Sequence, residues 1–136
     1  MRASPNRLLA TILGAVYLVV GVIGFFVTAG TAFFSLSGRL LLGLLGTNPF
    51  LSALDVLIGA ALLMGGLSTV AAAKTVTTIA GTAFLVLGIA GLFIIGTTFN
   101  ILALNGADNV LHFASAVVLL AVGLGSDRSV ATAVTD

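Results

Sequence analysis

The chain contains no cysteine and only one histidine among its 136 residues, and both scarcities exclude classes of function. Without cysteine there is no disulfide, iron–sulfur cluster, thiolate zinc site or dithiol redox pair. One histidine cannot supply the two axial imidazoles that a four-helix haem b protein takes from its own helices. A lone histidine with one aspartate also falls short of the three or four ligands of a zinc site. We therefore expect neither a cofactor nor a metal.

Charged residues are nearly as scarce, at 7% of the chain against 60% hydrophobic residues. A soluble domain covers its surface with roughly 25% charged residues, so this composition predicts a protein that is surrounded by a lipid bilayer. Five Lys and Arg residues against four acidic ones give a net charge of +1, without a basic cluster. We expect no nucleic acid partner, because binding to phosphates needs such a cluster.

Four segments are long and apolar enough to cross a bilayer as helices, which takes about 20 residues each. They cover about residues 8–29, 49–73, 75–97 and 106–125. The pattern predicts an all-α membrane protein without strands, in which one four-helix transmembrane domain covers residues 1–125. Residues 126–136 are predicted to form a polar cytoplasmic tail, which we expect to be disordered.

Basic residues near the ends of the crossings predict the orientation, because cytoplasmic loops are enriched in Lys and Arg. Arg2, Arg7, Lys74 and Arg128 fall on one side of the predicted bundle, and Arg39 falls on the other. We expect a protein of the bacterial cytoplasmic membrane with both termini in the cytoplasm. The short connection around Lys74 makes the second and third crossings a tight antiparallel hairpin.

The segment "GTAFFSLSGRLLLGLLGTN", residues 30–48, is too apolar for an ordinary loop. Gly38 and Arg39 interrupt it, so it is also too short to span. An interfacial or re-entrant helix between the first two crossings fits best. In one interpretation this segment is a lid at the outer headgroups, from which Arg39 reaches water or a lipid phosphate. In the other, Arg39 binds an anionic ligand.

The sequence repeats internally. "TILGAVYLVVGVIGFF" (11–26) aligns with "TIAGTAFLVLGIAGLF" (78–93) at an offset of 67 residues. "LLGTNPFLSALDVLIGAALLMGGL" (44–67) aligns with "ILALNGADNVLHFASAVVLLAVGL" (101–124) at an offset of 57 residues. Each unit has two crossings, so the two units have the same orientation in the membrane. We expect two tandem helical-hairpin repeats.

Glycines recur on one face of the first and third crossings, at spacings of seven and three residues. Small residues allow transmembrane helices to approach closely, so we interpret these positions as helix-packing positions. They are Gly14, Gly21, Gly24, Gly81, Gly88 and Gly91.

Asp55 and His112 occupy equivalent positions in the two repeats. Each follows an asparagine by seven residues, and both Asn48 and Asn105 are predicted to be helix N-caps. At 1.5 Å per residue, both side chains lie roughly 10 Å below the outer ends of their helices. A carboxylate inside a span costs about 2.5–3.5 kcal/mol on insertion scales, so Asp55 should point into the bundle and find a partner.

Three arrangements of the pair remain open. It forms a polar plug between the hairpins, or lines a water-filled cavity that handles protons, ions or a small solute, or meets a ligand, pigment or partner subunit. The supporting polar side chains are Asn48, Ser52, Asn105, Asp108, Asn109 and Ser115.

Together, the repeated "G-x-x-Y/F-L-x-x-G-x-x-G" helix and the Asn-x₆-His helix resemble a family of small four-helix membrane proteins of actinobacteria, catalogued only as a domain of unknown function. The resemblance extends over about residues 8–125, and "NGADNVLHFASAVVLL" is its most specific stretch. That family often carries His where this chain has Asp55, after an Asn-Pro like Asn48-Pro49. The aspartate therefore argues against a metal or haem bound by a symmetric histidine pair. The resemblance implies the fold and an actinobacterial cytoplasmic membrane, and it implies no activity.

The polar and small residues show no catalytic constellation, so we do not expect an enzyme. The leading expectation is an accessory or structural subunit that packs, through its glycine-rich faces, against a larger membrane complex or against itself. The alternative is a small channel or transporter for protons, ions or a polar solute that uses Asp55 and His112.

Overall fold

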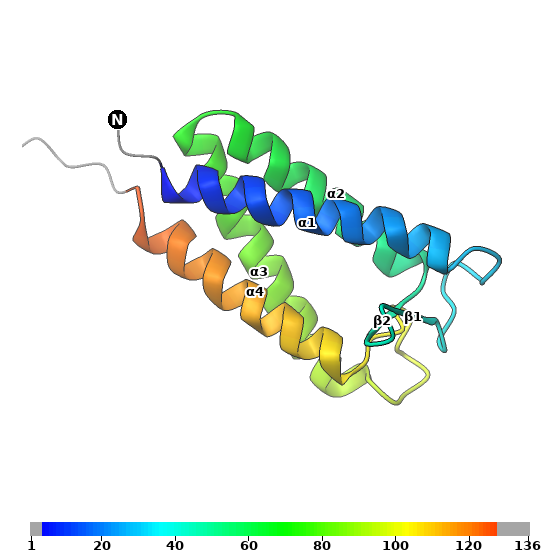
Figure 1. Cartoon of the computed structure of the whole chain (residues 1–136). Coiled ribbons are helices and arrows are strands. Elements are labelled where there is room, and N and C mark those ends of the chain that lie inside the picture. The colour runs from blue at the N-terminus through cyan, green and yellow to red at the C-terminus, as the bar shows by residue number, and fades with distance from the viewer. Residues whose placement is uncertain (1–3, 128–136) are drawn as a thin grey trace, which may run out of the picture.

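The structure, a computed structural model, describes residues 4–127 and consists mainly of four helices that run along one another (Figure 1). The helices are α1 (Pro5–Val27), α2 (Pro49–Leu67), α3 (Val70–Ile94) and α4 (Gly106–Gly125). All four are long and apolar enough to span a membrane, which indicates a multi-pass membrane protein. The contacts of α1 with α2 and of α3 with α4 are the most extensive, so the chain packs mainly as two hairpins.

Side-chain caps determine where the helices begin. Asn48 accepts a hydrogen bond from the Leu51 N–H at 2.8 Å, and the proline that follows it occupies the first helical position. Asn105 accepts from the Asp108 N–H at 3.0 Å, and the Asp108 carboxylate accepts from the Asn105 N–H in return. The predicted N-caps are therefore confirmed.

The turn between α2 and α3 lies earlier than the sequence predicts. It is formed by Ser68 and Thr69, whose hydroxyl caps α3 by accepting from the Ala72 N–H at 3.1 Å. The prediction that the connection surrounds Lys74 is wrong, because this residue lies in the second turn of α3. The long side chain of Lys74 instead extends to the segment after α4, where Nζ donates to the Ser126 carbonyl at 3.3 Å.

The prediction of a helix within residues 30–48 is also wrong, and so is the expectation of an all-α chain without strands. Strands β1 (Arg39–Leu41) and β2 (Leu45–Thr47) pair antiparallel in a short hairpin. Leu42 (φ 53°) and Gly43 (φ 71°) at its tip are both left-handed, a conformation that matches the twist of a tight hairpin and stops a helix. The position of this segment relative to a bilayer stays a prediction.

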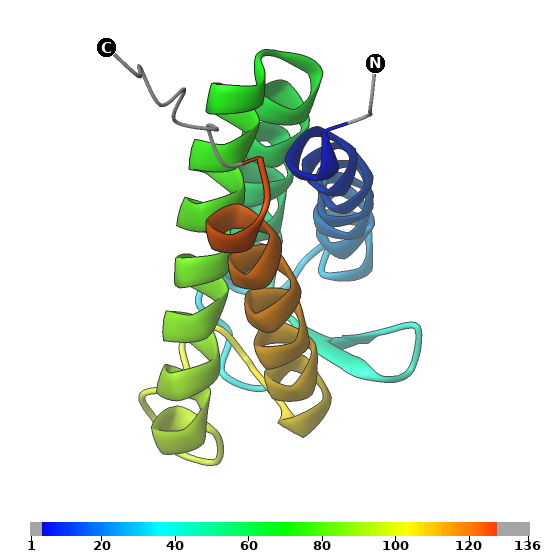
Figure 2. The same ribbon diagram turned by 90° about the vertical axis from the view of Figure 1, so that its left-hand side faces the viewer.

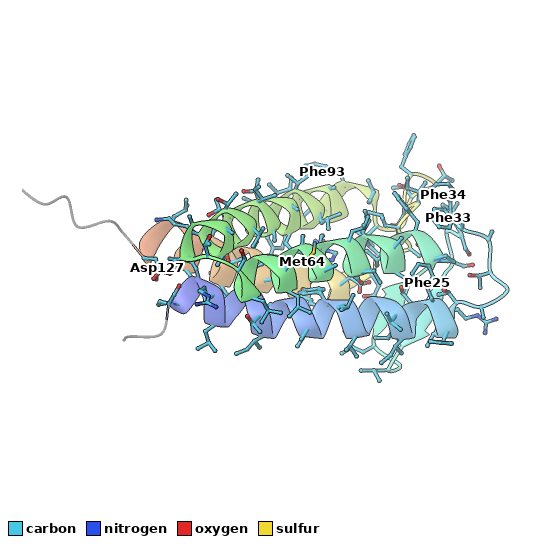
Figure 3. The ribbon with its side chains drawn as sticks, turned by 90° about the horizontal axis from the view of Figure 1, so that it is seen from above. Phe25, Phe33, Phe34, Met64, Phe93 and Asp127 are labelled. Carbon is cyan, nitrogen blue, oxygen red and sulfur yellow. The ribbon has the colours of Figure 1, made fainter. Side chains whose placement is uncertain are left out.

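Both described ends of the chain lie at one end of the bundle, which we call the terminal end, and the β-hairpin lies at the other, the hairpin end (Figures 1 and 2). The predicted tail lies outside the described residues from residue 128 on, and so do Arg2 and Arg128. Large apolar side chains lie on the outside of the bundle: Phe93 points away from it (Figure 3) and is 75% exposed, and Met64 is 67% exposed. Such an apolar exterior is what a bilayer requires.

Candidate polar site between the helices

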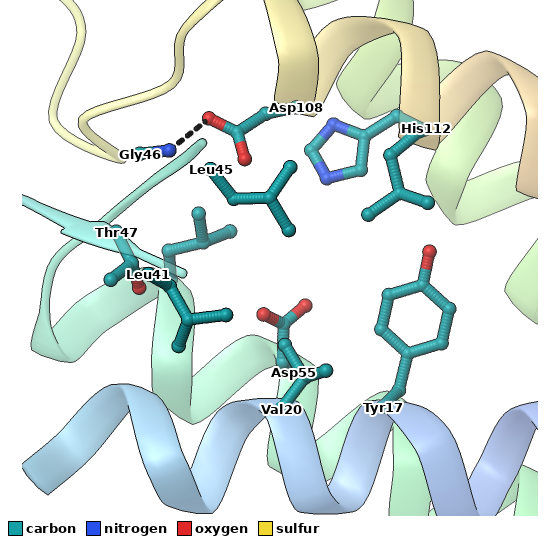
Figure 4. A pocket seen from close by; sticks show the side chains of 11 residues that line it. Tyr17, Val20, Leu41, Leu45, Gly46, Thr47, Asp55, Asp108 and His112 are labelled. Carbon is teal, nitrogen blue, oxygen red and sulfur yellow. Dashed lines mark hydrogen bonds between the residues drawn. The ribbon is translucent and has the colours of Figure 1, made fainter. Parts of the chain in front are cut away.

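Asp55 on α2 and His112 on α4 both line one small cavity near the hairpin end (Figure 4). We call it the polar cavity; its walls are Tyr17, Val20, Leu41, Leu45, Gly46, Thr47, Leu51, Asp55, Asp108, Leu111 and His112. Its volume is about 20 Å³, counted as the space open to the centre of a water molecule. A cavity needs about 10–15 Å³ by this measure to hold one water, so the polar cavity fits a single water molecule.

The two predicted site residues share this cavity without bonding to each other. Asp55 is 7% exposed and His112 is 3% exposed. Within residues 4–127 the Asp55 carboxylate accepts no hydrogen bond, and Nδ1 of His112 is buried without a partner. The His112 ring stacks on Phe84 of α3, with 5.6 Å between the ring centroids. The structure therefore places the pair around a common space and not in a direct contact.

Tyr17 of α1 is a third polar group at this site, which the sequence reasoning missed. Its hydroxyl forms a buried 2.6 Å hydrogen bond with the Ser115 hydroxyl of α4. Its ring packs on Phe84 with a centroid distance of 4.5 Å. The repeat alignment indicated only that Tyr17 corresponds to Phe84. The signal that was available is that Tyr17 is the only tyrosine in the chain.

Asp108 attaches the β-hairpin over the polar cavity. Its Oδ2 accepts hydrogen bonds from the buried Gly46 N–H at 3.0 Å and from the Asn105 N–H at 2.8 Å. Residues from both strands, Leu41 among them, line the cavity. Asp108 therefore lines the cavity, completes the cap of α4 and anchors the hairpin; the sequence predicted it as a supporting polar residue of the site, but not its bond to Gly46.

The two capping asparagines also connect the loops at the hairpin end. Asn48 Nδ2 donates to the Ile101 carbonyl at 2.7 Å, and Asn105 Nδ2 donates to the Leu44 carbonyl at 2.8 Å. Asn48 additionally donates to the Ser35 carbonyl at 2.9 Å. Each cap therefore holds backbone that belongs to the loop of the other helical hairpin.

The remaining predicted polar residues do not line the cavity. The Ser52 hydroxyl forms a 3.1 Å hydrogen bond with the Thr47 hydroxyl and lies against Gly24. Asn109 lies against Gly91, in a separate groove between α3 and α4. Of the predicted set, Asp108 lines the cavity and Ser115 contributes through Tyr17.

The predicted packing glycines all face helices of this same chain. A Cβ on Gly14 would overlap the backbone at Leu63 of α2, and one on Gly81 would crowd Leu120 of α4. The other close neighbours are Val56 for Gly21, Ser52 for Gly24, Phe113 for Gly88 and Asn109 for Gly91. Because these faces are already occupied, a partner protein has to use other surfaces.

A second polar cluster closes the terminal end of the bundle. Oδ2 of Asp127 accepts hydrogen bonds from the Ser4 hydroxyl at 2.6 Å and from the Asn6 amide group at 2.9 Å. These hydrogen bonds, that of Ser4 first, lower the pKa of the Asp127 carboxyl. Asn6 itself is fully buried. The sequence reasoning assigned Asp127 to the tail and gave no sign of this contact, because its partners are 121 to 123 residues away.

The acidic and histidine side chains of the described part of the chain lie apart from one another. Within residues 4–127, no three His, Cys, Asp or Glu side chains are grouped so that they could hold a metal ion. The site therefore offers separate hydrogen-bonding groups around a water-sized space.

The fold and this site define a small four-helix membrane protein with a buried polar cavity. Residues 7–125 match the family described as Domain of unknown function (DUF4383), and the chain belongs to that family. The expected resemblance to a family of unknown function is confirmed. No curated protein and no solved structure matches the chain.

Proposed function

We propose that this protein is a non-enzymatic integral membrane protein that serves as an accessory or structural subunit of a larger membrane complex or of a homo-oligomer. The observation that carries the proposal is the size of the polar cavity. With about 20 Å³, it has room for one water but for neither a substrate nor a file of ions. The polar groups at the hairpin end, such as Asp108 and Asn105, are used in bonds within the chain.

The partner surface in this proposal is the apolar exterior of the helices. Side chains such as Leu57, Met64 and Val117 are 65–67% exposed. Burial of these side chains against lipid or against a partner helix gives similar hydrophobic energy, so shape and packing determine which is preferred. Association through this surface leaves the internal glycine contacts intact.

The proposed location is the cytoplasmic membrane of an actinobacterium, with both termini in the cytoplasm. Arg7 and Lys74 lie at the terminal end, where Arg7 Nε donates to the Gly66 carbonyl at 3.1 Å and Lys74 reaches Ser126. Arg39 lies on β1 at the hairpin end. This distribution agrees with the positive-inside rule when the terminal end is cytoplasmic, and the hairpin then lies at the outer interface.

The proposed architecture is a tandem repeat of two helical hairpins. The reciprocal bonds of the capping asparagines support it, since the acceptor carbonyls of Leu44 and Ile101 are separated by the same 57 residues as Asn48 and Asn105. The symmetry axis would then lie along the membrane normal.

The test is purification of the tagged full-length protein from native membranes in a mild detergent, with mass determination of the intact particle. A tagged, unrelated four-span protein of the same membrane is the control. We expect a discrete particle that contains a stoichiometric partner or several copies of this chain. Recovery of a monomer alone would contradict the proposal.

A second candidate is a small proton, ion or polar-solute channel or transporter. The observation in its favour is that Asp55, His112 and Tyr17 face one water-sized space. The protein is reconstituted in liposomes loaded with a pH-sensitive dye. Flux that disappears with Asp55→Asn and persists with Asp127→Asn would favour this candidate. No flux above that of protein-free liposomes would leave the subunit proposal as the better one.

A further inference from the structure

An open groove runs between α3 and α4 near the hairpin end, away from the polar cavity. It is lined by Gly91, Leu92, Ile95, Gly106, Asn109, Val110 and Phe113 and has a volume of about 450 Å³. Ligand-binding clefts typically measure about 300–1,000 Å³, so this groove is large enough for part of an organic molecule.

One polar side chain in this groove has no partner. Asn109 is only 7% exposed, and its Oδ1 is buried beside Gly91 without a hydrogen bond. Its backbone N–H donates to the Asn105 carbonyl at 3.1 Å, but its side-chain amide forms no hydrogen bond within the described part of the chain. With Oδ1 turned to Gly91, the amino group is the part of the amide that can reach into the groove. A polar group that faces hydrocarbon without a partner costs free energy, so this amide favours an occupant with a hydrogen-bond acceptor.

At the equivalent position in the first half of the chain, the polar side chain does have a partner within the chain. Ser52 precedes Asn109 by 57 residues in the repeat alignment, and its hydroxyl bonds to Thr47. The residue that corresponds to Thr47 is Leu104, which has no hydroxyl. The α1–α2 connection is also longer than that between α3 and α4, and it places Thr47 of the β-hairpin beside Ser52. The second half has no hydroxyl at the position that corresponds to Thr47.

We propose that this groove binds the glycerol-ester region of a diacyl phospholipid, with the Asn109 amino group donating to an ester carbonyl. The polarity along the groove matches such a ligand. Gly106 and Asn109 lie within about 6 Å of the Asn105 cap along the helix axis, whereas Phe113 lies about 6 Å deeper. A phospholipid places its ester carbonyls at the boundary of the hydrocarbon and its acyl chains below, where Phe113 and Leu92 provide apolar walls.

The test compares two phospholipids that differ only at the proposed contact. The delipidated full-length protein is incubated in detergent with dioleoyl phosphatidylglycerol or with its diether analogue, which lacks the ester carbonyl oxygens. Native mass spectrometry then gives the fraction of protein that retains one lipid. One hydrogen bond is worth about a three- to tenfold difference in affinity, so we expect the diacyl lipid to bind about that much more tightly.

Three variants locate the site. Asn109→Leu removes the amide with little change in volume and should make the two lipids bind equally. Gly106→Leu fills the open end of the groove, where an added Cβ meets nothing within 4 Å, and should weaken the binding of both lipids. Gly125→Leu is the matched control at the opposite end of α4, where an added Cβ also meets nothing within 4 Å. It should bind lipid like the unchanged protein.

Equal retention of the diacyl and diether lipids by the unchanged protein would overturn the proposal. Undiminished preference for the diacyl lipid in Asn109→Leu would overturn it as well, because the selectivity would then arise elsewhere. A third contrary result would be that, in native membranes, a second protein is cross-linked to position 110 in stoichiometric amount and excludes lipid from the groove. The first two results are independent of whether the protein is a subunit of a larger complex, whereas the third would overturn the lipid proposal and support the subunit proposal.

Discussion

Replacement of Asp108 by alanine is expected to detach the β-hairpin from α4. The buried Gly46 N–H would lose its acceptor, which costs about 1–3 kcal/mol. The Asn105 N–H would lose its half of the capping box, and loss of a cap costs about 0.5–2 kcal/mol. Together the two losses are about 1.5–5 kcal/mol of stability at the hairpin end, and the loss at Gly46 acts on the hairpin itself. Asp108→Asn keeps an uncharged acceptor oxygen, so we expect it to lose about half as much.

Amide hydrogen exchange in detergent measures this loss directly. A local destabilisation of 2 kcal/mol corresponds to about a 30-fold faster exchange, so the peptide that covers residues 39–47 should exchange about that much faster in Asp108→Ala. The centre of α2 should keep its protection.

Asp127→Ala is the matched control, because it removes a carboxylate that also accepts from backbone and side-chain donors, but at the terminal end. It should leave hairpin exchange unchanged. Unchanged protection of the Gly46 amide in Asp108→Ala would refute the reasoning. The hairpin would then depend on other bonds, such as that from Asn105 to Leu44.

Three further changes test other parts of the structure. Tyr17→Phe leaves the buried Ser115 hydroxyl unpaired and should lower the free energy of unfolding by about 1–3 kcal/mol; adding Ser115→Ala should recover most of that loss. Gly14→Leu pushes α1 off α2 and should cost about 1–3 kcal/mol or more, measured by unfolding in mixed micelles; a neutral effect would contradict the close packing. The folded pKa of Asp127 lies below the ordinary value of about 4, chiefly through Ser4, so its stabilisation is present above that value and is lost as the pH falls through the lowered pKa. Between about pH 5 and pH 3, thermal stability should therefore fall more in the unchanged protein than in Asp127→Asn, and equal slopes would argue against this contact.

The helix starts were predictable because caps are local. Asn48 and Asn105 lie within three residues of the groups that they bond, so the sequence around each is sufficient to predict them. The turn between α2 and α3 was misplaced because a charged residue, Lys74, was expected in a loop. Its long side chain lets it sit inside α3 and still reach a polar partner.

The β-hairpin and the place of Tyr17 in the site depend on contacts between residues that are far apart in the sequence. Nothing local in the leucine-rich segment indicates strands, since the tip is Leu42-Gly43 and not one of the usual Asn-Gly or Asp-Gly turns. The segment is held by Asp108, which is 62 residues from Gly46. Tyr17 likewise joins the site through Ser115, 98 residues along the chain. Spacing alone predicted that Asp55 and His112 lie at the same depth. It could not reveal that the two side chains line a water-sized space and do not bond to each other.

The contact of Ser4 and Asn6 with Asp127 also bears on how the protein is made. A ribosome releases the first helix long before residue 127 exists, so Asn6 enters the membrane without the carboxylate that later receives its amide proton. The bond forms only when α4 has been inserted and its end has returned to the side from which α1 started. A chain that stops after three crossings therefore leaves the Asn6 amino group without its acceptors on Val122 and Asp127. The last residues of the bundle thus complete a contact whose first partners are made at the very start of synthesis.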